Sequence, residues 1–321
     1  MLTAILRRVA LSALTLFLVS LLVFLATEVL PGDALDVFLT EEDLQSMTAA
    51  QLEEKRREYG LDRPAPARFL SWVAGAVRLD FGVTFIDKAP IFQLIRHPML
   101  NSLQLGLLIT LLTVPVALAI GISTGYWRGR RADGVVSTLS IVGYSIPDFV
   151  IGTLLIILLA VWLPVFPARI LAFADAPWSE LLAVSLLPAL AVIIGHVAHL
   201  GRLLRAGFIE SMNSEFVERA RLSGIPERSV VFRHALAASV IPSLNSFALY
   251  VAGVLNGLIV IEKVFGYPGL GLELIEAVNK REVHVVQAIT FLAALLVIGM
   301  NLLADLCIIL LDPRVRSHVR A

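Results

Sequence analysis

The chain has 321 residues, of which 58% are hydrophobic and 16% charged, and its formal net charge is zero. This composition is typical of a membrane protein, and the balanced charge argues against nucleic acid as a partner. A single cysteine excludes an intrachain disulfide and a metal cluster built from cysteines.

The chain begins with an apolar segment and continues with a long polar one. Residues 9–27 are uncharged, follow Arg7 and Arg8, and are long enough to cross a bilayer. We expect a retained transmembrane helix with a cytoplasmic N-terminus, because a secretory signal has a shorter apolar core. Residues 31–98 are expected to form an extracytoplasmic loop with a short helix between Thr48, as its N-cap, and Gly60.

Five further apolar stretches approach or exceed the roughly 20 residues that a transmembrane helix needs. They cover about residues 100–124, 135–163, 181–200, 240–261 and 283–311. Prolines within such stretches are tolerated in a membrane, where neighbouring helices stabilise the interrupted backbone. The sequence therefore predicts an all-α membrane protein, a single domain with six transmembrane helices.

Basic residues in the short loops predict which end of the molecule lies in the cytoplasm. Two arginines precede the first span, the sequence WRGRRAD after the second span has three, and the tail after residue 311 has three more. The loop around Arg169 has one basic residue. The positive-inside rule therefore places both termini and the polar segment 205–240 in the cytoplasm.

The polar segment 205–240 has a helical pattern in its first half. Four apolar residues recur every four positions, namely Phe208, Met212, Phe216 and Ala220, and Ile209 and Val217 widen this apolar face. Gly224 interrupts this helix, and Pro226 is suited to start another because the first helical turn does not need its N–H. An apolar helix face among so many charged residues should be buried against something. The two candidates are a partner protein and the membrane surface.

The sequence contains no catalytic constellation. None of its lysines follows a glycine, which excludes a P-loop for ATP. His196 and His199 lie three residues apart and could share a helix face, but no second carboxylate–histidine motif accompanies them. We therefore predict no metal site, and we interpret the two histidines as facing a lumen or another helix.

Several polar residues inside the predicted spans have two interpretations, as parts of a solute pathway or as ties between helices. Such residues are costly in lipid and should face protein or water. The candidates for the pathway are Asp148, His196, His199, Asn245 and Asn256. For Asp305, in the last span, we favour the structural role. The stretch FGYPGLG before that span is predicted to form an extracytoplasmic turn.

The second half of the polar segment resembles the EAA loop of ABC importer permeases. Glu218, Ala220 and Gly224 stand where that motif has its glutamate, second alanine and glycine, and Arg219 replaces the first alanine. The sequence RHALAASVIP resembles the segment that follows the loop in the dipeptide, oligopeptide and nickel group.

Other stretches resemble the same group, in the same order along the chain. They are SLLVFLATEVLPGD, YGLDRPAPARFLSWVAGAVRLDFGVTF, GYSIPDFVIG, VIEKVFGYPGLG and NLLADLCIILLDPRVR. Asp148 departs from the pattern, since an uncharged residue is usual at that position. The chain is identified as a member of this family of permease subunits.

The resemblance implies a type I, binding-protein-dependent permease fold with a cytoplasmic coupling loop. In such importers the EAA loop forms a coupling helix that is seated in a groove of a cytoplasmic ATPase subunit. The residues implied at that interface are Glu218, Arg219, Ala220, Gly224, Ile225 and Pro226. We expect Glu218 to anchor the turn, by capping it or by pairing with an arginine.

The resemblance also implies the rest of the assembly. The partners are two ATPase subunits, a second permease that is usually a related but different chain, and an extracytoplasmic solute-binding protein. ATP and Mg²⁺ would bind the ATPase subunits, so we expect no cofactor and no enzymatic activity on this chain. The expected location is the bacterial inner membrane, where lipid surrounds a multi-pass protein.

The expected solute is a peptide or a peptide-like compound, because the spans hold no soft or imidazole-rich cage for a metal. An importer of nickel or of opine-type solutes in the same family is the alternative. A secondary transporter driven by an ion gradient could use Asp148, Asp305 and the histidines as a proton relay, but the internal repeat common in such folds is not apparent. An intramembrane metal enzyme would need a fuller set of ligands.

Overall fold

The computed structural model describes residues 2–28, 39, 47–58, 61–171 and 173–311, except for the side chains of residues 2, 4, 28, 240–249, 252, 255, 256, 304 and 307–311. This part of the chain is mostly helical and has no β-strand, which confirms the all-α prediction. The elements, in chain order, are α1 Leu2–Glu28, α4 Ala49–Glu58, α5 Ala65–Val77, α6 Ile91–Tyr126, α7 Arg131–Ser145, α8 Asp148–Leu155, η1 Ile156–Trp162, α9 Trp178–Met212, α10 Glu215–Leu222, α11 Glu227–Ser229, η2 Val230–Ala235, α12 Leu236–Phe265, α13 Leu270–Asn279 and α14 Val283–Leu311.

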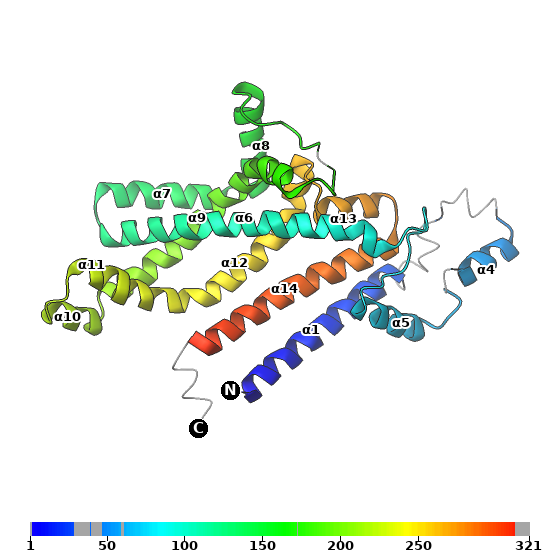
Figure 1. Ribbon diagram of the computed structural model, residues 1–321, viewed down its shortest axis with the longest axis horizontal. Coiled ribbons are helices and arrows are strands. Elements are labelled where there is room, and N and C mark those ends of the chain that lie inside the picture. The colour runs from blue at the N-terminus through cyan, green and yellow to red at the C-terminus, as the bar shows by residue number, and fades with distance from the viewer. Residues whose placement is uncertain (1, 29–38, 40–46, 59–60, 172, 312–321) are drawn as a thin grey trace.

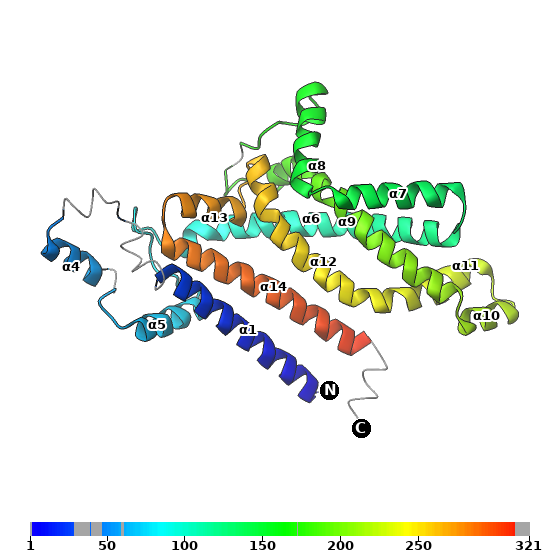
Figure 2. The ribbon, with the colours of Figure 1, turned by 180° about the vertical axis from the view of Figure 1, so that it is seen from behind.

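The long helices form an elongated bundle whose two ends differ (Figures 1 and 2). Helices α6, α9 and α12 make up its centre and share the main apolar core, which includes Leu105, Val192 and Leu258. Helices α1 and α14 lie side by side along one flank. Helices α10 and α11 lie at one end of the bundle, and α4, α5 and α13 lie at the other.

The start of α1 lies beside the end of α14, on the side of the bundle toward α10 and α11 (Figures 1 and 2). A hydrogen-bonded ion pair joins the two helices there, since Arg8 Nη1 donates to Asp305 Oδ2 at 2.8 Å. A charged side chain in a membrane needs such a partner, and the pair explains how α14 accommodates an aspartate. The structural role predicted for Asp305 is confirmed.

Four helical segments in the described residues are long and apolar enough to cross a membrane: 5–27 in α1, all of α6, all of α9, and 283–303 in α14. The bent pair of α7 with α8 and η1 passes the same test as a fifth, broken span. The sixth expected span, 240–261, lies in the 30-residue helix α12, where the side chains of 240–249 are outside the described part. The count of six spans therefore stays a prediction.

The predicted third span, 135–163, is not one continuous helix. Helix α7 ends at Ser145, α8 begins at Asp148, and the two helices are bent by 99°. Ile146 and Pro147 are both extended, with ψ angles of 126° and 141°. A residue before proline avoids the α-helical region and proline lacks an N–H, so the local sequence itself enforces the break. Helix α8 consequently projects away from the bundle (Figure 1).

Two helices extend beyond the limits of the predicted spans. Helix α6 begins at Ile91, directly after Pro90, so the polar segment before it ends earlier than residue 98. Helix α9 continues through Met212 and thus contains the first residues of the segment predicted as the coupling loop. The hydrophobic stretch alone set the predicted limits, whereas a helix continues into polar sequence wherever its backbone can keep hydrogen bonding.

The short helix predicted after Thr48 is confirmed as α4. Thr48 N donates to Gln51 Oε1 at 2.8 Å, and Gln51 N donates to Thr48 Oγ1 at 3.4 Å. These reciprocal bonds form a capping box, which satisfies two backbone donors at the helix start. The predicted helix end at Gly60 lies outside the described residues.

The predicted turn between the last two long helices is present, and a helix that the sequence analysis did not predict follows it. Gly266 ends α12 with a left-handed φ of 65°. The buried carboxylate of Glu262 accepts hydrogen bonds from Ser102 Oγ at 2.5 Å and from Gly271 N at 2.6 Å. These bonds connect α6, α12 and the start of α13, and they hold the three helices together at the end of the bundle where α13 lies.

Candidate coupling surface and intramembrane polar site

Residues 213–235 fold into a unit that we call the coupling hairpin. It comprises α10, the turn 223–226, α11 and η2. Its inner face is apolar: Val217 of α10 and Val230 of η2 are fully buried, and Phe208 of α9 packs against them. The hairpin is therefore held firmly on the long helix that precedes it.

The four-residue repeat predicted as one apolar face is broken in the structure. Helix α9 ends at Met212, and α10 begins after Ser214, whose backbone is extended with ψ 152°. The interruption changes the direction in which α10 presents its side chains. As a result Phe216 is 45% exposed, whereas Val217, which was also predicted on the apolar face, is fully buried. A periodicity argument applies only along a continuous helix, which is why the prediction fails at Phe216.

Gly224 ends α10, as predicted. Its φ is +77°, a conformation that residues with a side chain rarely adopt. Gly224 N donates to Arg221 O at 2.9 Å, and Ile225 N donates to Ala220 O at 3.2 Å. These two bonds form a Schellman cap, so the turn is closed by its own backbone.

An ion pair closes the same turn from outside. Arg221 Nε and Nη2 donate to the two carboxylate oxygens of Glu227, at 3.1 and 2.7 Å. The hydrogen-bonded guanidinium holds the pKa of Glu227 below its usual range. Glu218 was predicted to be the anchor, but its side chain is exposed and has no hydrogen bond or ion pair with a described residue. The anchor is therefore the pair of Arg221 and Glu227.

The residues predicted at the partner interface divide into two sets. The exposed set is Glu218, Arg219, Gly224 and Pro226. Ala220 is buried and Ile225 is half-buried, and both contribute to the core of the hairpin. These two residues shape the turn from inside, so a docking partner would not reach them directly.

The outer surface of the hairpin also carries apolar side chains. Phe216, Leu222 and Phe232 are 45%, 82% and 57% exposed. Phe232 lines an open groove together with Pro226, Arg228 and Ser229. A unit whose inner face is already packed and whose outer face is still apolar is suited to bind another protein.

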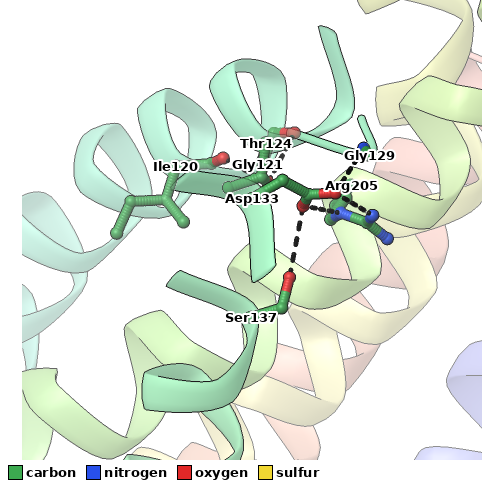
Figure 3. A network of polar contacts seen from close by, with 7 residues as sticks. All are labelled: Ile120, Gly121, Thr124, Gly129, Asp133, Ser137 and Arg205. Carbon is green, nitrogen blue, oxygen red and sulfur yellow. Dashed lines mark hydrogen bonds and ion pairs between the residues drawn. The ribbon is translucent and has the colours of Figure 1, made fainter. Parts of the chain in front are cut away.

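A buried ion pair ties the start of α7 to α9 (Figure 3). Asp133, in the first turn of α7, is 6% exposed. Arg205 donates to both of its carboxylate oxygens, with Nε at 3.0 Å and Nη2 at 2.9 Å. Gly129 N at 3.0 Å and Ser137 Oγ at 3.3 Å donate to the same carboxylate. With about four acceptor positions on a carboxylate, Asp133 is fully satisfied.

Asp148 is the first residue of α8 and lies where α8 meets α9 and α12. Gly195 of α9 permits this approach, because a Cβ there would lie 2.9 Å from Asp148 Oδ1. A Cβ on Gly257 of α12 would lie 3.8 Å from Oδ2. His196 Nδ1 is 3.7 Å from Oδ2, and the side chains of Asp148 and His196 are 25% and 20% exposed. The structure thus brings two of the predicted pathway residues together.

His199 has different surroundings from His196. Its ring stacks on Tyr144 of α7 with centroids 4.8 Å apart, and the guanidinium of Arg202 lies 5.5 Å from the centroid of the same tyrosine. The side chains of Asn245 and Asn256 lie outside the described residues. In the described part of the chain, no group of three or more His, Cys, Asp and Glu residues is arranged to hold a metal ion.

Comparison with known proteins decides the family. Residues 117–317 match the family described as the binding-protein-dependent transport system inner membrane component. The chain belongs to this family. It is an integral inner-membrane permease subunit of an ABC transport system, and membership implies partner ATPase and solute-binding components.

Relatives of the permease are similar along nearly its whole length. The probable peptide ABC transporter permease protein y4tP of Sinorhizobium fredii is 30% identical, over 97% of this chain and 98% of the relative. The dipeptide transport system permease protein DppB of Lactococcus lactis is 32% identical, over 97% and 98%. The glutathione transport system permease protein GsiC of Escherichia coli is 32% identical, over 94% and 95%.

Sequence analysis missed two features of the permease that the structure shows. The pair of Asp133 and Arg205 joins residues 72 positions apart, and no local pattern indicates it. The pair of Arg221 and Glu227 did have a signal: opposite charges flank a predicted glycine turn, six residues apart. Attention to charges on both sides of the turn would have found the second pair.

Proposed function

We propose that this permease forms, together with a second permease, the translocation path of an ATP-driven importer for peptides or peptide-like solutes. The observation that carries the proposal is the similarity over 97% of the chain to proteins named as peptide and dipeptide permeases. An extracytoplasmic binding protein delivers the solute. Two separate ATPase subunits bind ATP and Mg²⁺, and the permease has no cofactor and no enzymatic activity. The second permease is a related, non-identical chain.

The coupling hairpin is the docking surface for an ATPase subunit. Its inner face packs on Phe208 of α9 and on Ile122 of α6, so a displacement of the hairpin moves both long helices. Its outer face presents Leu222 and Phe216 beside the exposed charges of Glu218 and Arg219. Apolar anchors within a charged rim are the usual composition of a specific protein interface.

The proposed topology has six spans with both termini in the cytoplasm. Two observations support it. The start of α1 and the end of α14 lie on the side of the bundle toward the coupling hairpin (Figures 1 and 2). The arginine-rich loop between α6 and α7 is tied to α9 by Asp133 and Arg205, only a few residues before the hairpin begins. These segments therefore share one membrane side, which the positive-inside rule makes the cytoplasmic one.

The proposed pathway includes the polar residues of the spans. Asp148 and His196 lie at the bend between α7 and α8, where the broken span exposes them in part. Discontinuous helices are a common way for transporters to bring polar groups to a solute. His199, Asn245 and Asn256 are further candidates for the same pathway.

The sharpest test of the docking surface is a pull-down of the tagged permease from its native membrane in mild detergent. We expect an ATPase subunit to co-purify with the wild type and to be lost with Leu222→Asp, because the charge would be buried in the interface. Leu222 is 82% exposed, so the substitution should not affect the fold of the free chain. Leu171→Asp is the matched control: this leucine is 81% exposed but lies outside the hairpin.

Equal ATPase recovery with both leucine variants would show that the hairpin is not the docking surface. Absence of an ATPase from the well-folded wild type would refute the proposed function. A second pair of variants tests the turn itself. Gly224→Val should reduce recovery, because a β-branched residue is strained at φ +77°. Gly224→Asn should retain it, because asparagine tolerates the left-handed conformation.

A further inference from the structure

The carboxylates of the bundle differ in what satisfies them. Asp133 and Asp305 each accept hydrogen bonds from an arginine, and Glu262 accepts from a hydroxyl and a backbone amide. Asp148 accepts no hydrogen bond from a described residue, since His196 Nδ1 at 3.7 Å is beyond hydrogen-bond distance. An ionised carboxylate has about four acceptor positions, so Asp148 has the capacity to bind a donor from outside the chain.

His196 places a second acceptor beside this carboxylate. Its Nδ1 lies 2.9 Å from Val192 O, and because a carbonyl oxygen can only accept, Nδ1 carries the proton. In the neutral form of the ring, this tautomer leaves a lone pair on Nε2. The ring also packs edge-on against Tyr250, with centroids 5.3 Å apart, which fixes its orientation. The carboxylate of Asp148 is an acceptor, and Nε2 of His196 is a second acceptor in this tautomer.

The position of this pair makes it accessible. Its members lie where the third predicted span is bent by 99°, and both side chains are partly exposed. Gly195 and Gly257 lie next to the carboxylate, and neither has a side chain that could cover it. In a membrane an accessible, unsatisfied carboxylate is costly unless water or a solute occupies it.

We propose that Asp148 and His196 bind the α-ammonium group of a peptide while it crosses the membrane. The inference rests on the proposed function, in which peptides are the solutes. An ammonium group offers three N–H donors and no acceptor, so it complements a carboxylate that stands beside a neutral imidazole. Asp148 supplies the opposite charge and a charge-assisted hydrogen bond, and His196 Nε2 supplies a second acceptor.

Saturation-transfer difference NMR tests this site directly. The permease complex is purified in nanodiscs without its binding protein, and millimolar Ala-Ala is the probe. The matched probe is N-acetyl-Ala-Ala, which has an amide in place of the ammonium. We expect Ala-Ala to bind the wild type about tenfold more tightly than the acetylated probe does, since hydrogen bonds to charged groups are the stronger ones.

Substitutions of Asp148 test whether its charge causes the preference for Ala-Ala. Asp148→Asn should weaken Ala-Ala binding about tenfold and leave the acetylated probe unaffected, because the charge–charge attraction is lost. Asp148→Glu should retain most of the preference for Ala-Ala. Asp305→Asn is the matched control, since it removes another carboxylate of the bundle, one that is already occupied by Arg8. This control should bind both probes as the wild type does.

Three results would overturn the inference: equal binding of the two probes to the wild type, equal binding of Ala-Ala to the wild type and to Asp148→Asn, or no binding to the wild type. A complex in which a cation of the second permease occupies Asp148 would also overturn it. The same preparations are assayed for ATPase subunits. Their absence would refute the proposed function, whereas their presence with normal Ala-Ala binding to Asp148→Asn would refute only the ammonium site.

Discussion

Asp133 and Asp148 stand in the first turns of two consecutive helices, α7 and α8, yet their surroundings are opposite. Asp133 is 6% exposed and accepts hydrogen bonds from Arg205, Gly129 and Ser137. The side chain of Asp148 is 25% exposed, and in the described part of the chain its one ion-pair contact is with His196, at 3.7 Å. A carboxylate whose acceptor positions are filled by its own chain stabilises the fold. One whose positions are free is available to a solute.

The largest effect is expected for Asp133→Ala. Removing one partner of a buried ion pair leaves Arg205 unpaired, so the substitution should lower the free energy of unfolding by about 3 kcal/mol. The midpoint of thermal unfolding in detergent, followed by tryptophan fluorescence, measures this. Glu53→Ala is the control, since it breaks an ion pair with Arg57 in which both side chains are 69% exposed. Equal unfolding midpoints for the two variants would show that the hydrogen bonds and ion pair of Asp133 do not stabilise the fold.

Arg205→Lys should have an intermediate effect. Lysine keeps the charge but cannot donate two parallel hydrogen bonds to Asp133, so we expect a loss of about 1–2 kcal/mol. The same thermal midpoint reports it, with Arg205→Ala as the more severe comparison. If the lysine variant were as stable as the wild type, the two-pronged geometry of Arg205 would be irrelevant and charge alone would explain the pair.

Glu227 combines features of both aspartates, because it is hydrogen-bonded like Asp133 but exposed. Glu227→Gln should therefore cost at most about 1 kcal/mol. The pKa of Glu227 in the folded chain is lowered from 4.5, so its pairing with Arg221 stabilises the hairpin fully above pH 4.5 and is lost as the pH falls through the lowered pKa. Hydrogen exchange of the hairpin amides, corrected for intrinsic rates, should show this acid sensitivity in the wild type and not in Glu227→Gln.

The smallest effect on stability is expected for Asp148→Asn. No hydrogen bond from a described residue is lost, so the thermal midpoint should correspond to a change within about 0.5 kcal/mol. Cytoplasmic hairpin protection in the exchange experiment should be unchanged as well. A loss as large as that of Asp133→Ala would make Asp148 a structural tie between helices, and the comparison of the two aspartates would no longer hold.

The sequence by itself determined whatever depends on neighbours along the chain. Apolar runs indicate helices that a bilayer requires, Thr48 and Gln51 cap a helix through side chains three residues apart, and Gly224 ends one through its own backbone freedom. The break at Pro147 was equally local, because proline restricts itself and the residue before it. An uninterrupted helix over residues 135–163 is incompatible with this local restriction, although the bent pair still qualifies as one broken span.

Only the tertiary structure decided which polar groups meet. Arg8 and Asp305 are separated by 297 positions, and Arg205 and Asp133 by 72. No periodicity extends over such distances, because these contacts depend on how whole helices pack. The same reason explains why Phe216 faces outward and why Asp148 lacks the partner that Asp133 has. Residue type set the free-energy cost of placing each charge in the membrane. Helix packing decided whether another residue of the chain would pair with that charge.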